Sequence, residues 1–234
     1  MTQYPRSWRI SSRSPQAKTL AEPSGRQWYR ISNATAATAE VAIYDEVGFF
    51  GTNAADFTRE LKGITASSID VRLNSPGGEV FDGIAIYEAL RQHPAKVTTY
   101  IDGLAASIAS VIAMAGDRRI IGRNATMMIH EANGVCIGEC RDMRELADLL
   151  DKTSNNIADV YAKRSGRGTV ASWRALMKGE TWFVGAEAVE AGLATEQTDP
   201  DEGTDFAALA ANLTSPQRQS AEWAAVVARL TRNQ

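Results

Sequence analysis

The sequence predicts an α/β protein in which strands and helices alternate and most strands run parallel. Short apolar segments with the period of a strand are followed repeatedly by segments with the period of a helix. Turn residues, such as those of Asn74-Ser75-Pro76-Gly77-Gly78, separate the two kinds of segment. A long segment from Glu139 to Lys163 lacks Gly and Pro and has apolar residues at steps of three and four, which is typical of an amphipathic helix.

The composition is that of an ordinary globular protein, with 44% hydrophobic and 23% charged residues among 234. A net charge of −3 gives no reason to expect nucleic acid or an anionic membrane as a partner. No apolar run approaches the roughly 18 residues that a membrane span needs, and the N-terminus lacks the apolar core of a secretory signal. Cys136 and Cys140 have no second Cys/His cluster, so we expect two free thiols, no metal and a cytoplasmic location.

The individual elements follow from local signals. Pro94 ends one predicted helix, and Gly192 caps another. Strands are predicted at 40–44, 69–73, 97–101, 120–121 and 126–129, and helices at 53–61, 80–93, 107–115, 139–163, 170–177 and 186–191.

These signals divide the chain into four parts. Residues 1–38 mix Arg, Ser, Gln, Pro and Ala with little periodicity, which predicts an irregular N-terminal arm. One domain is expected over 39–196 and an acidic linker over 197–214. A final amphipathic helix is expected over 215–234, with Trp223 and Leu230 on its apolar side.

Ser107 is the strongest candidate for a catalytic residue. It follows the small residues Ala105 and Ala106 and opens an apolar helix, where a hydroxyl is placed to act as a nucleophile. A serine nucleophile needs a base, and the chain has two histidines. His130 ends an apolar strand, whereas His93 precedes a proline at the end of a helix, so His130 is the preferred base. The alternatives are that Ser107 is a simple N-cap and that His130 is structural.

Two backbone amides are candidates for an oxyanion hole. The N–H of Ile108 lies at the start of a helix, where backbone donors have no partner within the helix. The N–H of Gly78 lies in a Gly-Gly turn that lets the backbone approach a ligand closely. An ordinary strand-to-helix turn is the alternative interpretation.

A third group should orient the imidazole of His130. Glu180 precedes the extended segment Trp182-Phe183-Val184 and is our candidate, although it is one of 28 acidic residues and its spacing alone does not select it.

Four motifs, taken in order, resemble the caseinolytic (ClpP-type) serine peptidase family. They are Asn74-Ser75-Pro76-Gly77-Gly78, Gly103-x-Ala105-Ala106-Ser107, Met128-Ile129-His130 and Glu187-Ala188-Val189-Glu190-Ala191-Gly192-Leu193. The resemblance covers about residues 40–196 and implies a ClpP/crotonase-like fold. It also implies a catalytic Ser107 and His130, oxyanion amides at Gly78 and Ile108, and Glu180 at the position where the family usually has Asp.

The resemblance carries further expectations. The sequence Glu180-Thr181-Trp182-Phe183 is more similar to the ClpP-related head-maturation proteases of phages and prophages than to the housekeeping ClpP subunit of bacteria. The resemblance to these proteases implies an endopeptidase that needs no cofactor and that cleaves scaffold and capsid proteins. It also implies a homo-oligomeric ring, in which the long helix from Glu139 is the handle through which two rings stack. The sequence does not decide whether an ATP-driven unfoldase docks.

Two other functions fit parts of the pattern. A crotonase-type enzyme acting on acyl thioesters would also use two backbone amides, but it needs carboxylates instead of a Ser–His pair. A catalytically inactive ring component would explain the unusual Glu180 but not the presence of both Ser107 and His130.

Overall fold

The structure is a computed structural model that describes residues 28–33, 37–48 and 54–198. The expected C-terminal helix, residues 215–234, and residues 1–27 of the expected arm lie outside the described residues. None of the helices in the described ranges combines the length and apolarity needed to cross a membrane.

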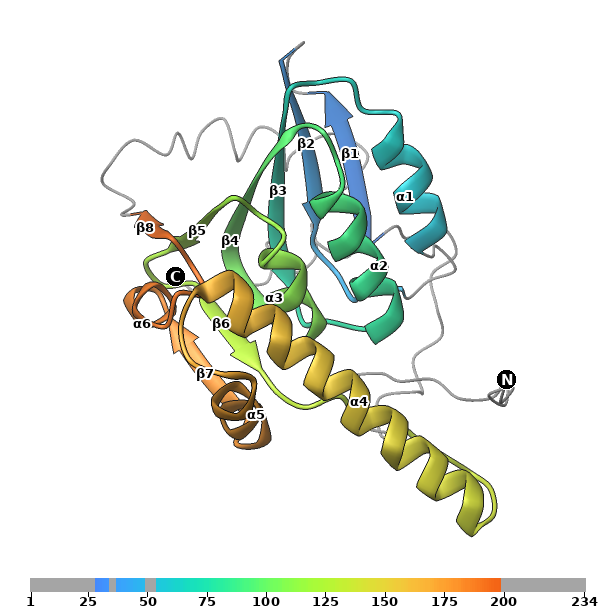
Figure 1. The fold of residues 1–234 in the computed structure, drawn as a ribbon. Helices are drawn as coiled ribbons and strands as arrows, with labels where there is room; N and C mark the ends of the chain where they lie inside the picture. The colour runs from blue at the N-terminus through green and yellow to red at the C-terminus, as the bar shows by residue number, and fades with distance from the viewer. Residues whose placement is uncertain (1–27, 34–36, 49–53, 199–234) are drawn as a thin grey trace, which may run out of the picture. The chain divides into compact units, whose positions relative to one another are not determined.

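A mixed sheet forms the centre of the domain and confirms the predicted α/β class (Figure 1). Its main path runs β1-β2-β3-β4-β5-β8, and all neighbours on this path are parallel except the first pair. The strands on this path are β1 (Tyr29–Asn33), β2 (Thr38–Ile43), β3 (Ser68–Ser75), β4 (Lys96–Ala106), β5 (Arg118–Gly122) and β8 (Glu196–Thr198).

Strand β4 is shared between two neighbours, and this fork creates the edge where the site lies. Its first half pairs with β5 from Thr98 to Ile101, and its end pairs in parallel with β6 (Thr126–Ile129) from Leu104 to Ala106. Strand β7 (Thr181–Val184) then pairs with β6 in antiparallel fashion. The ends of β4 and β6 therefore meet at one edge of the sheet.

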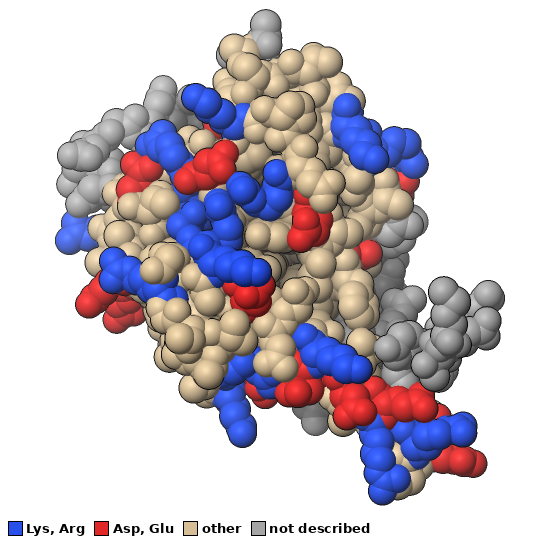
Figure 2. Space-filling view, in the orientation of Figure 1, with Lys and Arg blue, Asp and Glu red and all other residues tan. Residues whose placement is uncertain are grey.

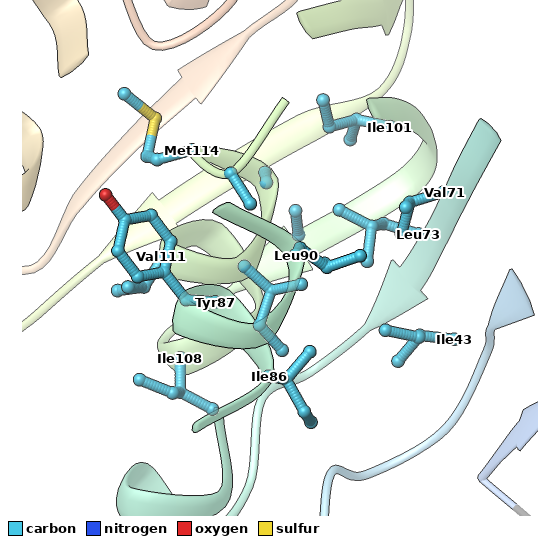
Figure 3. Packing of buried hydrophobic residues seen from close by; sticks show 14 of the residues in the cluster. Ile43, Val71, Leu73, Ile86, Tyr87, Leu90, Ile101, Ile108, Val111 and Met114 are labelled. Atoms are coloured by element: carbon cyan, nitrogen blue, oxygen red, sulfur yellow. The ribbon is translucent and has the colours of Figure 1, made fainter. Parts of the chain in front are cut away.

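Helices α1, α2 and α3 cover one face of this sheet (Figure 1). The helices of the domain are α1 (Ala54–Lys62), α2 (Val80–Arg91), α3 (Ile108–Ala113), α4 (Cys140–Ser165), α5 (Val170–Lys178) and α6 (Ala186–Glu190). Figure 3 shows side chains of α2, among them Ile86 and Leu90, between the strand residues Val71 and Leu73 and helix α3. Burial of these branched apolar side chains is the main force that holds α2 on the sheet.

Helix α4 is the long amphipathic helix that its sequence period predicts. Its second half is anchored by buried residues such as Ile157 and Tyr161, whereas the start of the helix projects away from the sheet (Figure 1). Glu139 and Asp142 form a reciprocal capping box at that projecting end. Figure 2 shows Lys/Arg and Asp/Glu side chains intermixed over this end of the molecule.

Two boundaries differ from the sequence-based expectation. Part of the segment expected to be an irregular arm forms β1, because Tyr29–Asn33 pairs with β2 and Trp28 is buried against Phe57. Gln197, which we assigned to a linker, belongs to β8 and pairs with Ile121. In both cases pairing with another strand, the adjacent β2 for β1 and the distant β5 for β8, organises a segment that has no clear period of its own.

Candidate active site

Ser107 lies in the turn between β4 and α3 in a backbone conformation that non-glycine residues rarely adopt. Its φ is 55° and its ψ is −127°. Among the described non-glycine residues only Ser107 and Glu180 have a positive φ, and both were singled out from the sequence. Such strained residues gather at functional sites, where the surrounding structure holds them in place.

The sheet itself brings His130 to Ser107. The parallel register pairs Ala106 with Met128, and the ladder continues with the Ser107 N–H donating to the Met128 carbonyl over 2.8 Å. His130 is the first residue after β6, as Ser107 is the first after β4, so both side chains emerge at the same edge. The distance between His130 Nε2 and Ser107 Oγ is 2.6 Å, which is that of a strong hydrogen bond.

The surroundings of the imidazole favour its neutral form. Burial lowers the pKa of His130 below its usual value, and the nearby negative charge of Glu180 opposes part of this effect. A neutral imidazole can accept the proton of the Ser107 hydroxyl, as a general base must.

Glu180 reaches the site through the β6–β7 register. Ile129 pairs with Thr181, so Glu180 is the next residue across from His130. Its carboxylate, however, accepts a long hydrogen bond of 3.4 Å from the Trp182 indole N–H. Within the described part of the chain, the imidazole has a hydrogen bond to Ser107 but none to Glu180.

The Gly-Gly turn packs directly on the peptide that follows Ser107. A Cβ at Gly77 would lie 2.7 Å from the Ser107 Cβ and 3.3 Å from the Ile108 nitrogen, so only glycine fits there. Gly78 forms a parallel bridge with Val47, in which Val47 donates to the Gly77 carbonyl and accepts from the Glu79 N–H. The two hydrogen bonds of this bridge are made by Gly77 and Glu79, so the N–H of Gly78 takes no part in the pairing.

Ile108 is the first residue of α3, so its N–H has no acceptor within the helix. A small pocket opens beside Ser107 and His130. Its walls are mostly apolar and include Val80, Val111, Ile157 and Tyr161. Across the described ranges, no three His, Cys, Asp or Glu side chains gather as a metal site requires.

One charged residue at the pocket, Glu131, is not identified from the sequence. Glu131 follows His130 and receives two hydrogen bonds from Arg174, which also binds Asp151 over 2.9 Å. Arg174 thereby joins α5 and α4 to the segment that carries His130. The position of Glu131 directly after the candidate base was the available signal, but its partner lies 43 residues away.

Comparison with known proteins adds an independent finding. Residues 23–199, about three quarters of the chain, match the family described as Clp protease. The chain is 34% identical over 125 residues to the ATP-dependent Clp protease proteolytic subunit 1 of Protochlamydia amoebophila, covering 52% of this chain and 60% of that protein. The subunit 1 of Chlamydia abortus is also 34% identical over 125 residues, covering 52% and 65%.

A third relative, the ATP-dependent Clp protease proteolytic subunit of Bacteroides fragilis, is 29% identical over 165 residues, covering 66% of this chain and 79% of that protein. The aligned part of the chain spans less than two thirds of the length of the two chlamydial relatives. The mixed α/β architecture is consistent with this family.

Proposed function

The chain belongs to the Clp protease family, and we propose that it acts as a serine-type endopeptidase with Ser107 as its nucleophile. The observation that carries the proposal is the 2.6 Å distance between Ser107 Oγ and His130 Nε2 at a strained strand-to-helix turn. A serine hydroxyl is inert at neutral pH unless a base removes its proton during attack, and His130 is positioned to do so.

The proposed reaction has two halves. In the first, Ser107 Oγ attacks the peptide carbonyl, His130 takes the hydroxyl proton and then gives it to the leaving amine, and an acyl-enzyme remains. In the second, His130 takes a proton from water, the resulting hydroxide attacks the ester, and the proton returns to Ser107 as the acid leaves. The N–H groups of Gly78 and Ile108 hold the tetrahedral oxyanion, each contributing about 2.7 to 4 kcal/mol by analogy with measured donors.

The role of Glu180 in this reaction is to stabilise the imidazolium of His130 by its charge. Its place across from His130 in the β6–β7 register supports that role, and so does its effect on the pKa of His130. In the structure the carboxylate is turned toward Trp182, so a small rotation is needed before it accepts from the imidazole.

A fluorophosphonate probe tests the nucleophile directly, because it reacts with activated serines regardless of substrate preference. We expect the wild-type protein to be labelled and the Ser107→Ala variant to be unlabelled. The Ser67→Ala variant, which alters an exposed serine outside the site, is the control and should label normally. Labelling that persists in Ser107→Ala would exclude this nucleophile.

We further propose that the subunits form a homo-oligomeric ring and that two rings stack through the projecting part of α4.

We also propose that the protein cleaves scaffold and capsid proteins during phage head maturation, in the cytoplasm of a bacterial host. The support for this substrate is the sequence Glu180-Thr181-Trp182-Phe183, which is similar to that of phage maturation proteases. Mass spectrometry of a candidate capsid or scaffold protein after incubation should show discrete cleavage sites. Absence of Ser107-dependent products from these proteins, alongside cleavage of unrelated peptides, would contradict this substrate.

A second candidate is a catalytically inactive ring component, and one observation favours it: Glu180 hydrogen-bonds to Trp182 and not to His130. In that case assembly would be the function, and the wild-type protein would assemble but remain unlabelled by the probe.

A further inference from the structure

Two buried polar side chains lie beneath Ser107 and have no part in the reaction described above. Ser110 is 0% exposed and Tyr161 is 1% exposed. The Ser110 and Tyr161 hydroxyl oxygens are 2.7 Å apart. Ser110 also binds the carbonyl oxygen of Ser107 twice, through its hydroxyl over 2.5 Å and through its N–H over 3.0 Å.

The direction of these hydrogen bonds is fixed by the number of protons. A carbonyl can only accept, so the single hydroxyl proton of Ser110 goes to Ser107. The Tyr161 hydroxyl must then donate to the Ser110 oxygen. Burial raises the pKa of Tyr161 well above its usual value, so the phenol keeps the proton that it donates. The result is a chain of donors from Tyr161 through Ser110 to the Ser107 carbonyl.

The carbonyl held by this chain belongs to the same peptide unit as the Ile108 N–H. A peptide unit is planar and trans, so its C=O and N–H point in opposite directions. Fixing the Ser107 carbonyl therefore fixes the direction of the Ile108 N–H. Without such a restraint, the unfavourable φ and ψ of Ser107 would favour rotation of this plane.

We propose that Ser110 and Tyr161 are positioning residues that hold the Ser107–Ile108 peptide plane and so aim the Ile108 N–H at the developing oxyanion. This inference rests on the proposed peptidase function. It concerns residues outside the proposed oxyanion hole and the Ser107–His130 pair, although Tyr161 also lines the pocket beside Ser107.

The test compares Tyr161→Phe, Ser110→Ala and the double variant with the wild-type protein. Tyr161→Phe keeps the ring and its packing on Trp173, at 5.5 Å between centroids. The double variant removes both hydroxyls, so it leaves no buried polar group without a partner and should fold. Tyr29→Phe is the matched control, because it removes one tyrosine hydroxyl that donates to Glu60 far from the site.

The readouts are the rate of fluorophosphonate labelling, kcat and KM on a cleaved peptide, the pH profile and the melting temperature. A poorly aimed donor weakens transition-state binding alone, so we expect the double variant to lose about tenfold or more in kcat and labelling rate. We expect KM and the acid midpoint of the profile to be unchanged, because neither the pocket shape nor the His130 environment is altered. Each single variant should lose nearly as much as the double one, since both act through one chain.

The inference is overturned if the double variant labels and turns over at the wild-type rate, or if only its melting temperature falls. It is also overturned if the effects of the two single variants simply add. Failure of the wild-type protein itself to label would instead remove the proposed peptidase function, and the inference with it. Should the double variant not fold, Tyr161→Phe alone is measured in the same way.

Discussion

Glu180 lies next across from His130 in the antiparallel β6–β7 register, yet its carboxylate binds the Trp182 indole and not the imidazole. The hydrogen bond to Trp182 is 3.4 Å long and therefore weak. The positive φ of Glu180, 49°, directs its side chain away from the position that an ordinary strand residue would take. The carboxylate is thus close enough to act on His130 by charge, and its hydrogen bond to Trp182 is weak.

We predict that Glu180→Gln lowers kcat about 10- to 100-fold. The substitution keeps the shape of the side chain but removes the charge that we propose stabilises the imidazolium, and the loss should be smaller than for a triad whose acid is already hydrogen-bonded. Glu190→Gln, on the exposed side of α6, is the control and should keep full activity. Peptide-cleavage kinetics check both, and an unchanged kcat in Glu180→Gln would remove Glu180 from the mechanism.

The pH dependence should reflect the lowered pKa of His130. Since the proposed base, His130, acts in its neutral form, the acid limb of kcat/KM should have its midpoint below 6.5, the usual value for histidine. Glu180 raises this pKa, so Glu180→Gln should move the midpoint further toward acid. A profile measured from about pH 5 to 8 tests both statements. A midpoint above 6.5 would contradict the burial of the imidazole.

The same shift has a consequence for stability. The unfolded chain binds the His130 proton more readily than the folded one, so this group makes the free energy of unfolding fall as the pH drops below 6.5. The loss should level off once the pH is below the folded-state pKa. Urea unfolding of the wild-type protein and of His130→Gln across this range isolates the contribution of the imidazole.

Gly77→Ala should damage the site more than the fold. Its Cβ would lie 2.7 Å from the Ser107 Cβ and 2.9 Å from the Ala106 carbonyl oxygen, so the turn must move away from Ser107. We expect about a hundredfold slower labelling, as for other small displacements in active sites, and a stability loss of about 1 to 3 kcal/mol.

Gly122→Ala is the matched control for this prediction. A Cβ at Gly122 would be 3.5 Å from its nearest neighbour, and its φ is not in the left-handed region. It should label normally and be as stable as the wild-type protein or slightly more so. Equal labelling of the two alanine variants would show that the Gly-Gly turn does not support Ser107.

Much of this arrangement is predictable from the sequence because local signals carry it. The apolar steps of α4 and the small residues before Ser107 need no knowledge of distant partners. The extent of β4 is different: Asp102 and Gly103 interrupt its apolar pattern, and the strand continues to Ala106 because β6 pairs with its end and Ser75 of β3 pairs with Ala105. Register between segments far apart in the sequence is not a local property.

The polar contacts around the site depend on the orientation of each side chain as well as on its position in the fold. The positive φ of Glu180 and the contact of its carboxylate with Trp182 have no signature in the sequence. Ser110 does carry one signal, since a serine on an otherwise apolar helix needs a buried partner. That partner, Tyr161, is 51 residues away on another helix, and only the packing of α4 on α3 brings the two together.

The projecting part of the domain should mediate self-association. Ile137 is 95% exposed, and Val135 and Met143 nearby are about half exposed, an apolar surface that is unusual for a monomer. We predict that Ile137→Asp lowers the oligomer size in sedimentation velocity without changing the far-UV circular dichroism. Lys62→Glu, an exposed charge change on α1, should leave the oligomer intact. Unchanged assembly in Ile137→Asp would mean that this end does not join the subunits.

Trp28→Ala tests whether β1 belongs to the cooperative domain, which the sequence did not predict. Trp28 is 1% exposed, stacks on Phe57 with 5.9 Å between ring centroids, and its carbonyl accepts from the Tyr44 N–H. Removing a buried indole from such a contact costs about 3 to 5 kcal/mol, so the urea midpoint should fall clearly while the transition stays single. Phe81→Ala removes an aromatic ring that is 54% exposed and should change stability by no more than about 0.5 kcal/mol. If Trp28→Ala unfolded at the wild-type midpoint, the segment around β1 would open independently of the sheet, and the domain would begin where the sequence first placed it, near Ala39.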